Sequence, residues 1–149
     1  MRESIFRGKL LNNGEWAFGY FCEFANNRTG EQESYIQTIK QDGRIDLIHK
    51  IDPFTVGQYT GMVDKRIFEG DVFKYGFDEV AAIGVVKFGE YSFGSHFDMN
   101  NVGFYVEWNP RAMYYRSDLG FWLKQRKADI ELIGNIYDNP ELLGESSNE

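Results

Sequence analysis

The segment Trp16-Ala17-Phe18-Gly19-Tyr20-Phe21-Cys22-Glu23-Phe24 contains the clearest β-strand pattern in the chain. Apolar or aromatic side chains occupy every second position, at residues 16, 18, 20, 22 and 24. Because successive side chains of a strand point to opposite faces of a sheet, these five share one face. The residues Asn26-Asn27-Arg28-Thr29-Gly30 that follow are typical of a turn, since Asn and Gly tolerate positive φ. We therefore expect a strand that leads into a hairpin or a longer loop.

Further β-prone runs follow this strand along the chain. Asp42-Gly43 stands between runs 35–40 and 45–51, which is a strong hairpin pattern. Pro53 ends the second run, because proline has no N–H for a sheet ladder. Strands are also expected at 55–61, 72–75, 82–88, 102–108, 120–123 and 130–137, and a short helix is an alternative around Tyr114. Short strands joined by tight turns predict a mainly β fold with little helix, either a small barrel or a sandwich.

Length and composition favour one folded domain. The chain has 149 residues, of which 42% are hydrophobic and 17% aromatic, which excludes a disordered protein. No composition break or linker divides it, so we expect a single domain over residues 1–143. Residues 144–149 are small, polar and acidic, and we expect them to form a disordered tail.

The expected location is the cytoplasm. No apolar run approaches the roughly 20 residues of a membrane-spanning helix, and the charged start lacks the apolar stretch of a signal peptide. The single cysteine, Cys22, cannot form an intramolecular disulfide, whereas small secreted domains usually contain several.

Charge is unevenly distributed along the chain. The formal net charge is −7, which predicts repulsion of nucleic-acid phosphates, yet residues 111–127 contain five cations and one anion. One interpretation is a nucleic-acid-binding segment in which aromatic rings stack on bases. The other, which the acidic remainder favours, places the aromatic rings in the core and the cations on a solvated edge. The candidate binding residues are Arg111, Tyr114, Tyr115, Arg116, Lys124, Arg126 and Lys127.

Catalytic and metal-binding patterns are weak. His96 with Asp98, and His49 near Asp52, pair an imidazole with a carboxylate, but such pairs are common by chance. Cys22 and the two histidines are too few for a structural zinc site. Carboxylates that could hold Mg²⁺ lie around turns, where acidic residues are usually solvated, namely Asp64, Glu69, Asp71 and Asp78. We therefore expect no catalytic residues, no metal and no cofactor.

Three segments resemble the signature of the YopX family, namely 52–61, 69–72 and 133–143, and the opening Met1-Arg2-Glu3 with Phe18-Gly19-Tyr20 also matches it. The connection before Ile67 contains Arg66 where the family usually carries an Asn-Gly turn. The resemblance implies a phage or prophage protein of a bacterial host cell, an SH3-like fold and self-association. It transfers no catalytic residues. The signature residues, for which we expect structural roles, are Gly57, Gln58, Tyr59, Gly61, Glu69, Gly70, Asp71, Gly134, Asn135, Asn139 and Pro140.

Three functional hypotheses remain open from the sequence. The first is a non-enzymatic accessory protein that binds a protein partner or itself through exposed aromatic patches or sheet edges. The second is a nucleic-acid-binding module that uses residues 111–127. The third, for which the sequence offers least, is an enzyme built on carboxylates or His96.

Overall fold

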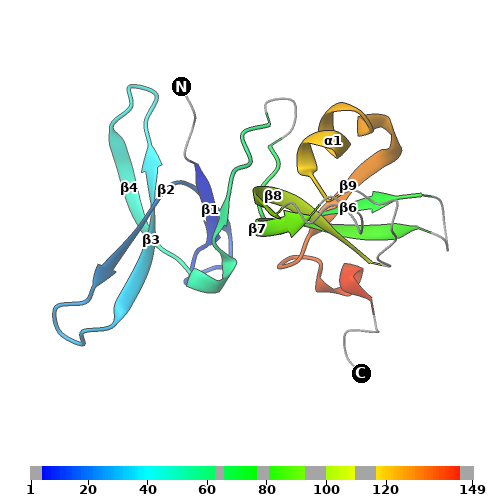
Figure 1. The fold of residues 1–149 in the computed structure, drawn as a ribbon. Coiled ribbons are helices and arrows are strands. Elements are labelled where there is room, and N and C mark those ends of the chain that lie inside the picture. The colour runs from blue at the N-terminus through cyan, green and yellow to red at the C-terminus, as the bar shows by residue number, and fades with distance from the viewer. Residues whose placement is uncertain (1–4, 63–65, 77–80, 93–99, 110–116, 145–149) are drawn as a thin grey trace. The chain divides into compact units, whose positions relative to one another are not determined.

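The computed structural model describes residues 5–62, 66–76, 81–92, 100–109 and 117–144. Its strands form two antiparallel sheets, labelled in Figure 1, so the expected mainly β class is confirmed. Among the described residues neither sheet closes into a barrel, and the finer SH3-like assignment stays a prediction. The chain divides into two compact units, residues 1–68 and residues 69–149, which are described separately. The expectation of a single domain over residues 1–143 stays a prediction.

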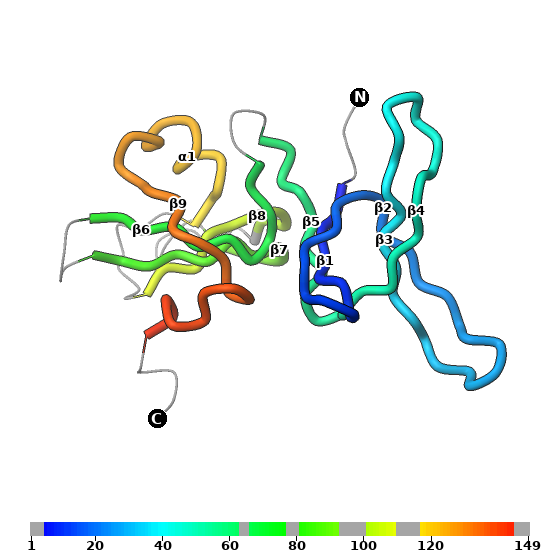
Figure 2. Tube along the Cα trace, turned by 180° about the vertical axis from the view of Figure 1, so that it is seen from behind, coloured from blue at the N-terminus to red at the C-terminus, as the bar shows by residue number. Residues whose placement is uncertain are grey.

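Unit 1, residues 1–68, contains a five-stranded sheet in the order β4-β3-β2-β1-β5. Figure 2 shows β1 between β2 and β5, with the β3–β4 hairpin beyond β2. The elements are β1 (Phe6–Lys9), β2 (Trp16–Ala25), β3 (Gln32–Ile39), β4 (Ile45–Lys50), the 3-10 turn η1 (Pro53–Thr55) and β5 (Gly57–Gln58). The predicted hairpin at Asp42-Gly43 is confirmed, because it joins β3 to β4.

The core of unit 1 lies on the inner face of this sheet. Ala17, Ile36 and Ile51 are buried there, and partly buried apolar side chains pack against them, including Phe21. An isolated bridge from Leu10 to Ile51 brings the end of β1 to the end of β4. Fully burying a side chain such as Ile36 stabilises the folded state by about 1.5–3 kcal/mol.

Unit 2, residues 69–149, contains a four-stranded sheet in the order β8-β7-β6-β9. Val72, Phe73, Val86 and Val106 are buried in it. The elements are β6 (Asp71–Tyr75), β7 (Ala82–Ser92), β8 (Asn100–Asn109), α1 (Leu119–Lys124), the 3-10 turns η3 (Lys127–Asp129) and η4 (Pro140–Leu143), and β9 (Ile130–Asn135). The expected strands at 72–75, 82–88, 102–108 and 130–137 are therefore present with shifted ends.

The expected strand at residues 120–123 is wrong, because this segment forms the helix α1. Leu119 and Trp122, three positions apart, are the buried residues of α1, which matches a helical period. A short apolar run cannot by itself distinguish a strand from a buried helix. Packing of the Trp122 ring against Trp108, with ring centroids 4.9 Å apart, accompanies the helical conformation.

Candidate functional site

The outer face of β2 carries the aromatic side chains that the sequence places together. Burial alternates along the first half of the strand: Ala17 and Gly19 are buried, whereas Phe18 and Tyr20 are exposed. The shared face is thus present on the side opposite Ala17, and at its start the Phe18 ring packs against the buried Phe68 ring, with centroids 5.6 Å apart. Phe18, Tyr20 and Phe24 are between 41% and 52% exposed, and we call these three the aromatic row.

Strand pairing extends this outer face across β3 and β4. Cys22 pairs with Tyr35, which pairs in turn with Lys50. Tyr20 pairs with Gln37, and Gln37 with Ile48. Cys22 is half-buried, and its Sγ lies 3.9 Å from the carbonyl oxygen of Tyr35. The face therefore combines exposed rings with one aliphatic side chain and a small group of polar side chains.

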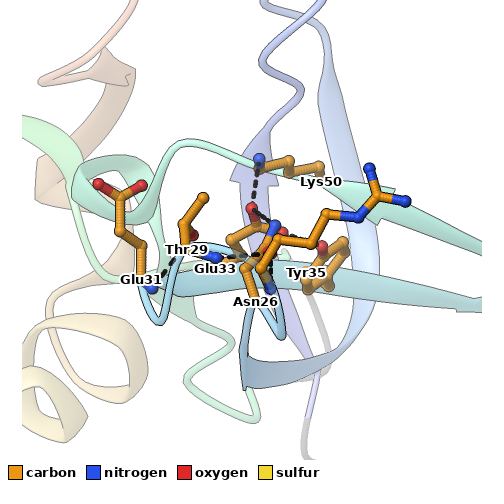
Figure 3. Close-up of polar contacts among 7 residues, drawn as sticks. Asn26, Thr29, Glu31, Glu33, Tyr35 and Lys50 are labelled. Carbon is orange, nitrogen blue, oxygen red and sulfur yellow. Dashed lines mark hydrogen bonds and ion pairs between the residues drawn. The ribbon is translucent and has the colours of Figure 1, made fainter.

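These polar side chains converge on Glu33, as Figure 3 shows. The Glu33 carboxylate accepts hydrogen bonds from the Tyr35 hydroxyl and from the Asn26 amide, the latter at 2.9 Å. The Lys50 ammonium group lies 3.0 Å from the same carboxylate. The Asn26 side chain also accepts the backbone N–H of Arg28 at 2.8 Å, which fixes the turn between β2 and β3. The network therefore ties β3, β4 and the turn between β2 and β3 together.

The network shifts the pKa values of its two titratable members in opposite directions. The hydroxyl of Tyr35, followed by Asn26 and Lys50, lowers the pKa of the Glu33 carboxyl to about 2. The same contact with Glu33 raises the pKa of Tyr35 above its ordinary value. General bases work best with a pKa near the operating pH. A carboxylate with a pKa of about 2 is a weak base and a retained tyrosine proton is a weak acid, so this arrangement suits structure and binding rather than acid–base catalysis.

The edge strand β4 forms a second exposed surface. Ile45, Leu47 and Ile48 are 53–55% exposed, and we call them the aliphatic edge. Thr38 fixes the middle of this strand, because its hydroxyl accepts the Leu47 N–H at 3.1 Å and donates to the Leu47 carbonyl at 3.3 Å. The pairing of β3 with β4 shifts register at this point. Sequence periodicity did not reveal this edge, since it cannot show that β3 is the only neighbour of β4 among the described strands.

The predicted nucleic-acid segment is described in part. Arg111, Tyr114, Tyr115 and Arg116 lie outside the described residues. Lys124 ends α1, Arg126 follows it and Lys127 begins η3, and all three are exposed. The Arg126 Nε lies 2.5 Å from the Asp129 carboxylate. Trp122 is one of the aromatic residues of the 111–127 segment, and its ring is buried against Tyr75 and Trp108. The three described cations thus lie within four residues of one another. The tryptophan of this segment is buried and does not present its ring beside them.

The first signature segment, residues 52–61, follows β4 in unit 1. Gly57 and Gln58 make up β5 and pair with β1. The Tyr59 hydroxyl donates to the Met62 carbonyl at 2.7 Å, and Tyr59 itself bridges to Phe68. Gly61 follows with a φ of 83°, a left-handed conformation that favours glycine. These residues thus lie in strand pairs and in a turn, and their structural role stays a prediction.

The second and third signature segments meet in unit 2. The Gly70 N–H donates to Val86 at 2.8 Å, and its carbonyl accepts the Ile136 N–H at 2.9 Å. Asp71 is buried and pairs with Asn135 of β9, and Glu69 lies two positions before Asp71. A Cβ at Gly134 would lie 2.3 Å from the Asn139 Oδ1, so this close approach requires glycine. Pro140 begins η4 directly after Asn139.

The remaining candidates for chemistry are distributed as follows. His49 is half-buried in β4, opposite Ile36. His96, Asp98, Asp64 and Asp78 lie outside the described residues. Within the described ranges no three His, Cys, Asp or Glu side chains gather as a metal site would require. Of the helices in those ranges, none has the length and apolar character needed to cross a membrane.

Comparison with known proteins gives one match. The model of the family described as YopX protein matches residues 5–144, nearly the whole chain. No curated protein and no solved structure matches the chain. The family match includes all three signature segments and both structural units. The chain therefore belongs to the YopX family.

Proposed function

We propose that this YopX-family protein is a non-enzymatic accessory protein of a phage or prophage, and that it acts in the host-cell cytoplasm by binding another protein or a second copy of itself. The observation that carries this proposal is the aliphatic edge of unit 1. Three large aliphatic side chains on one edge strand are each more than half exposed. Exposed apolar sheet edges are surfaces that proteins cover when they associate.

The local structure supports β4 as a contact surface of fixed shape. The Thr38 hydroxyl holds Leu47 in place, and Ile48 pairs with Gln37 of β3. At its far end, the Lys50 carbonyl accepts the Leu11 N–H at 3.3 Å, so the first turn of unit 1 covers the edge there. The accessible part of the strand is thus its first four residues, which contain all three aliphatic side chains. A partner would gain apolar burial mainly from this stretch.

A matched set of variants tests this proposal. Ile45→Thr, Leu47→Thr and Ile48→Thr together place threonine, a β-branched residue suited to a strand, at each position while removing apolar surface. The control is Phe54→Ser, which removes a side chain that is 87% exposed on η1, outside the aliphatic edge. Tagged proteins are recovered from prophage-induced cells after nuclease treatment, and their self-association is measured by sedimentation velocity.

We expect the triple variant to lose a partner protein or the self-associated species that the wild type and Phe54→Ser retain. Equal recovery and equal sedimentation for all three proteins would contradict the proposal. A thermal unfolding curve of the triple variant, with its midpoint close to that of the wild type, shows that the loss does not come from unfolding.

A further inference from the structure

The first half of β8 forms a regular sheet edge in unit 2. The whole strand pairs with β7 in one constant register over ten residue pairs. On its other side the second half of β8 is occupied, because the Val106 N–H donates to the Ser117 carbonyl at 2.7 Å and Tyr105 bridges to Asp118. Residues 100–104, which we call the β8 edge, have β7 as their only neighbour among the described strands.

The β8 edge directs backbone groups away from β7. Alternate residues of a strand direct their N–H and C=O groups to the same side. Val106 directs its N–H to Ser117, on the side away from β7. Asn100, Val102 and Phe104 share this direction, so the edge presents three donors and three acceptors in regular alternation. Such a row is a template for pairing with another strand.

Apolar side chains accompany these backbone groups. Val102 is 69% exposed, and Phe88, which lies opposite Phe104, is 49% exposed. The rings of Phe88 and Phe104 are in contact, with centroids 5.0 Å apart. On the other face of the ribbon, the rings of Tyr91 and Tyr105 stack with centroids 5.6 Å apart. A strand added to this edge would therefore bury apolar surface as well as form hydrogen bonds.

The β8 edge also differs from the other long edges of the two sheets. Proteins usually protect exposed edges with charges, prolines or bulges. The edge strands β4 and β9 both show a register shift in their pairing, which interrupts a regular edge. The pairing of β8 contains no such shift, and residues 100–106 include no charged residue and no proline. The β8 edge is thus the more regular template.

We infer that the β8 edge pairs in antiparallel orientation with the β8 edge of a second copy of this protein. In a two-fold interface, residue i contacts residue j and j contacts i. Pairing centred on Val102 meets this condition, because Val102 then faces Val102 of the second copy and Asn100 faces Phe104. All three outward residues of each copy become hydrogen-bonded. The pairing ends where Asp118 already bridges to Tyr105.

Charge favours a second copy and does not oppose this register. An edge without charged residues offers nothing that selects a charged partner strand, whereas its three outward residues match those of a second copy one to one. The carboxylate opposite Val102 on β7 is Glu90. In the paired copies, the two Glu90 residues would be separated by three strand spacings, or about 14 Å. This exceeds the screening length of about 8 Å at physiological ionic strength.

The expected association is weak and depends on concentration. Five residues of each copy are paired, whereas a standard protein interface involves roughly 20–30 residues a side. The β8 edge lies in unit 2, and its pairing does not depend on the aliphatic edge of unit 1. If both surfaces act as proposed, the aliphatic edge serves another protein and the β8 edge serves self-association.

Sedimentation velocity of the full-length protein, from low to millimolar concentration, tests this inference with variants at residue 102. Val102→Lys and Val102→Glu each place like charges directly opposite one another in the pair of copies, which is destabilising. Both variants also carry Glu90→Gln, because Glu90 faces residue 102 within the ribbon. The controls are Glu90→Gln alone and the triple threonine variant of the aliphatic edge.

We expect the wild type and both controls to form a dimer reversibly as the concentration rises. Val102→Lys and Val102→Glu lose the dimer when each is alone, and an equimolar mixture of the two regains it, because lysine then faces glutamate. The amide resonances of residues 100–104 shift with concentration in the wild type and not in the Val102→Lys variant. Unchanged thermal unfolding midpoints show that substitutions at this exposed position leave the fold intact.

Four results would overturn the inference. They are a wild type that stays monomeric at millimolar concentration, Val102 variants that associate as the wild type does, a mixture that stays monomeric, and a loss of the dimer confined to the triple threonine variant. The last result would assign self-association to the aliphatic edge instead. A monomeric wild type would leave the binding of another protein at the aliphatic edge intact, since protein recovery measures that contact separately.

Discussion

The ammonium nitrogen of Lys50 in β4 lies 3.0 Å from the carboxylate of Glu33 in β3, on the outer face of unit 1. Together with the Tyr35 hydroxyl and the Asn26 amide, this contact keeps the Glu33 carboxyl ionised down to a pH far below its usual range. Through Glu33, this network connects β4 to the turn between β2 and β3. Because it lowers the pKa of Glu33, its effect can be measured as a pH dependence of stability and by titration of the side chains.

Glu33 is expected to make the stability of the protein depend on pH between about 4.5 and 2. Its pKa is lower in the folded than in the unfolded state, so the unfolded chain binds more protons in this window. The stabilising contribution is therefore present above the unfolded-state pKa and is lost as the pH falls through about 2. Glu33→Gln should unfold at a lower temperature than the wild type at pH 6, and the difference should shrink towards pH 2. Glu31→Gln, in the adjacent turn, is the control, and a difference independent of pH would contradict this assignment.

Tyr35 is expected to ionise later than an ordinary tyrosine. Its hydroxyl donates to the Glu33 carboxylate, which raises its pKa above 10. The folded pKa is raised, so the associated stabilisation is present below the unfolded-state pKa and is lost as the pH rises through the folded value. Titration of the Tyr35 ring by NMR should show this late ionisation, and Glu33→Gln should return it towards the ordinary range. In Tyr35→Phe, the pKa of Glu33 should rise, because its largest stabilising contact is removed. An unchanged Glu33 pKa would show that Asn26 and Lys50 alone account for the shift.

Gly84→Ala is expected to destabilise unit 2. Gly84 lies opposite Trp108 across β7 and β8, and a Cβ there would lie 2.4 Å from Val106 Cγ1 and 2.8 Å from Trp108 Cε3. Forcing an extra carbon into such a packed site costs about 1–3 kcal/mol. Urea unfolding followed by tryptophan fluorescence measures this change. The matched control is Gly120→Ala in α1, where a Cβ meets nothing within 4 Å and the change should be neutral or stabilising. Equal unfolding curves for the two variants would contradict the packing argument.

Thr55→Val is expected to destabilise unit 1 although the two side chains have nearly the same shape. The buried Thr55 hydroxyl accepts the Lys9 N–H at 2.8 Å and donates to the Asp52 carbonyl at 2.7 Å. Valine would leave both backbone groups without these contacts, at a cost of about 1–3 kcal/mol. Thr29→Val removes an exposed hydroxyl that accepts the Glu31 N–H at 3.2 Å, and it should have a much smaller effect. Chemical unfolding of both variants decides the comparison, and an equal loss would show that burial at Thr55 is not the cause.

Local patterns predicted much of the β structure. The alternation from Trp16 to Phe24 predicted β2, and Asp42-Gly43 predicted the β3–β4 hairpin, because both patterns follow from backbone geometry over a few residues. Residues 120–123 were wrongly expected to be a strand, since α1 depends on packing of Leu119 and Trp122 in the unit 2 core. The polar network was not predicted either. Glu33 and Lys50 meet only through the register between β3 and β4, and no local spacing specifies that contact.

The sequence by itself determined that the five alternating side chains of β2 share one face, that the fold is mainly β and that the chain resembles the YopX family. It did not determine which face of β2 is buried. Tertiary packing decided this, because Ile36 and Ile51 close over Ala17 on the inner side of the sheet. Phe18, Tyr20 and Phe24 remain on the outer side. A strand with apolar residues on both faces has no local preference for either one, so the partners that the rest of the chain brings to it make the choice.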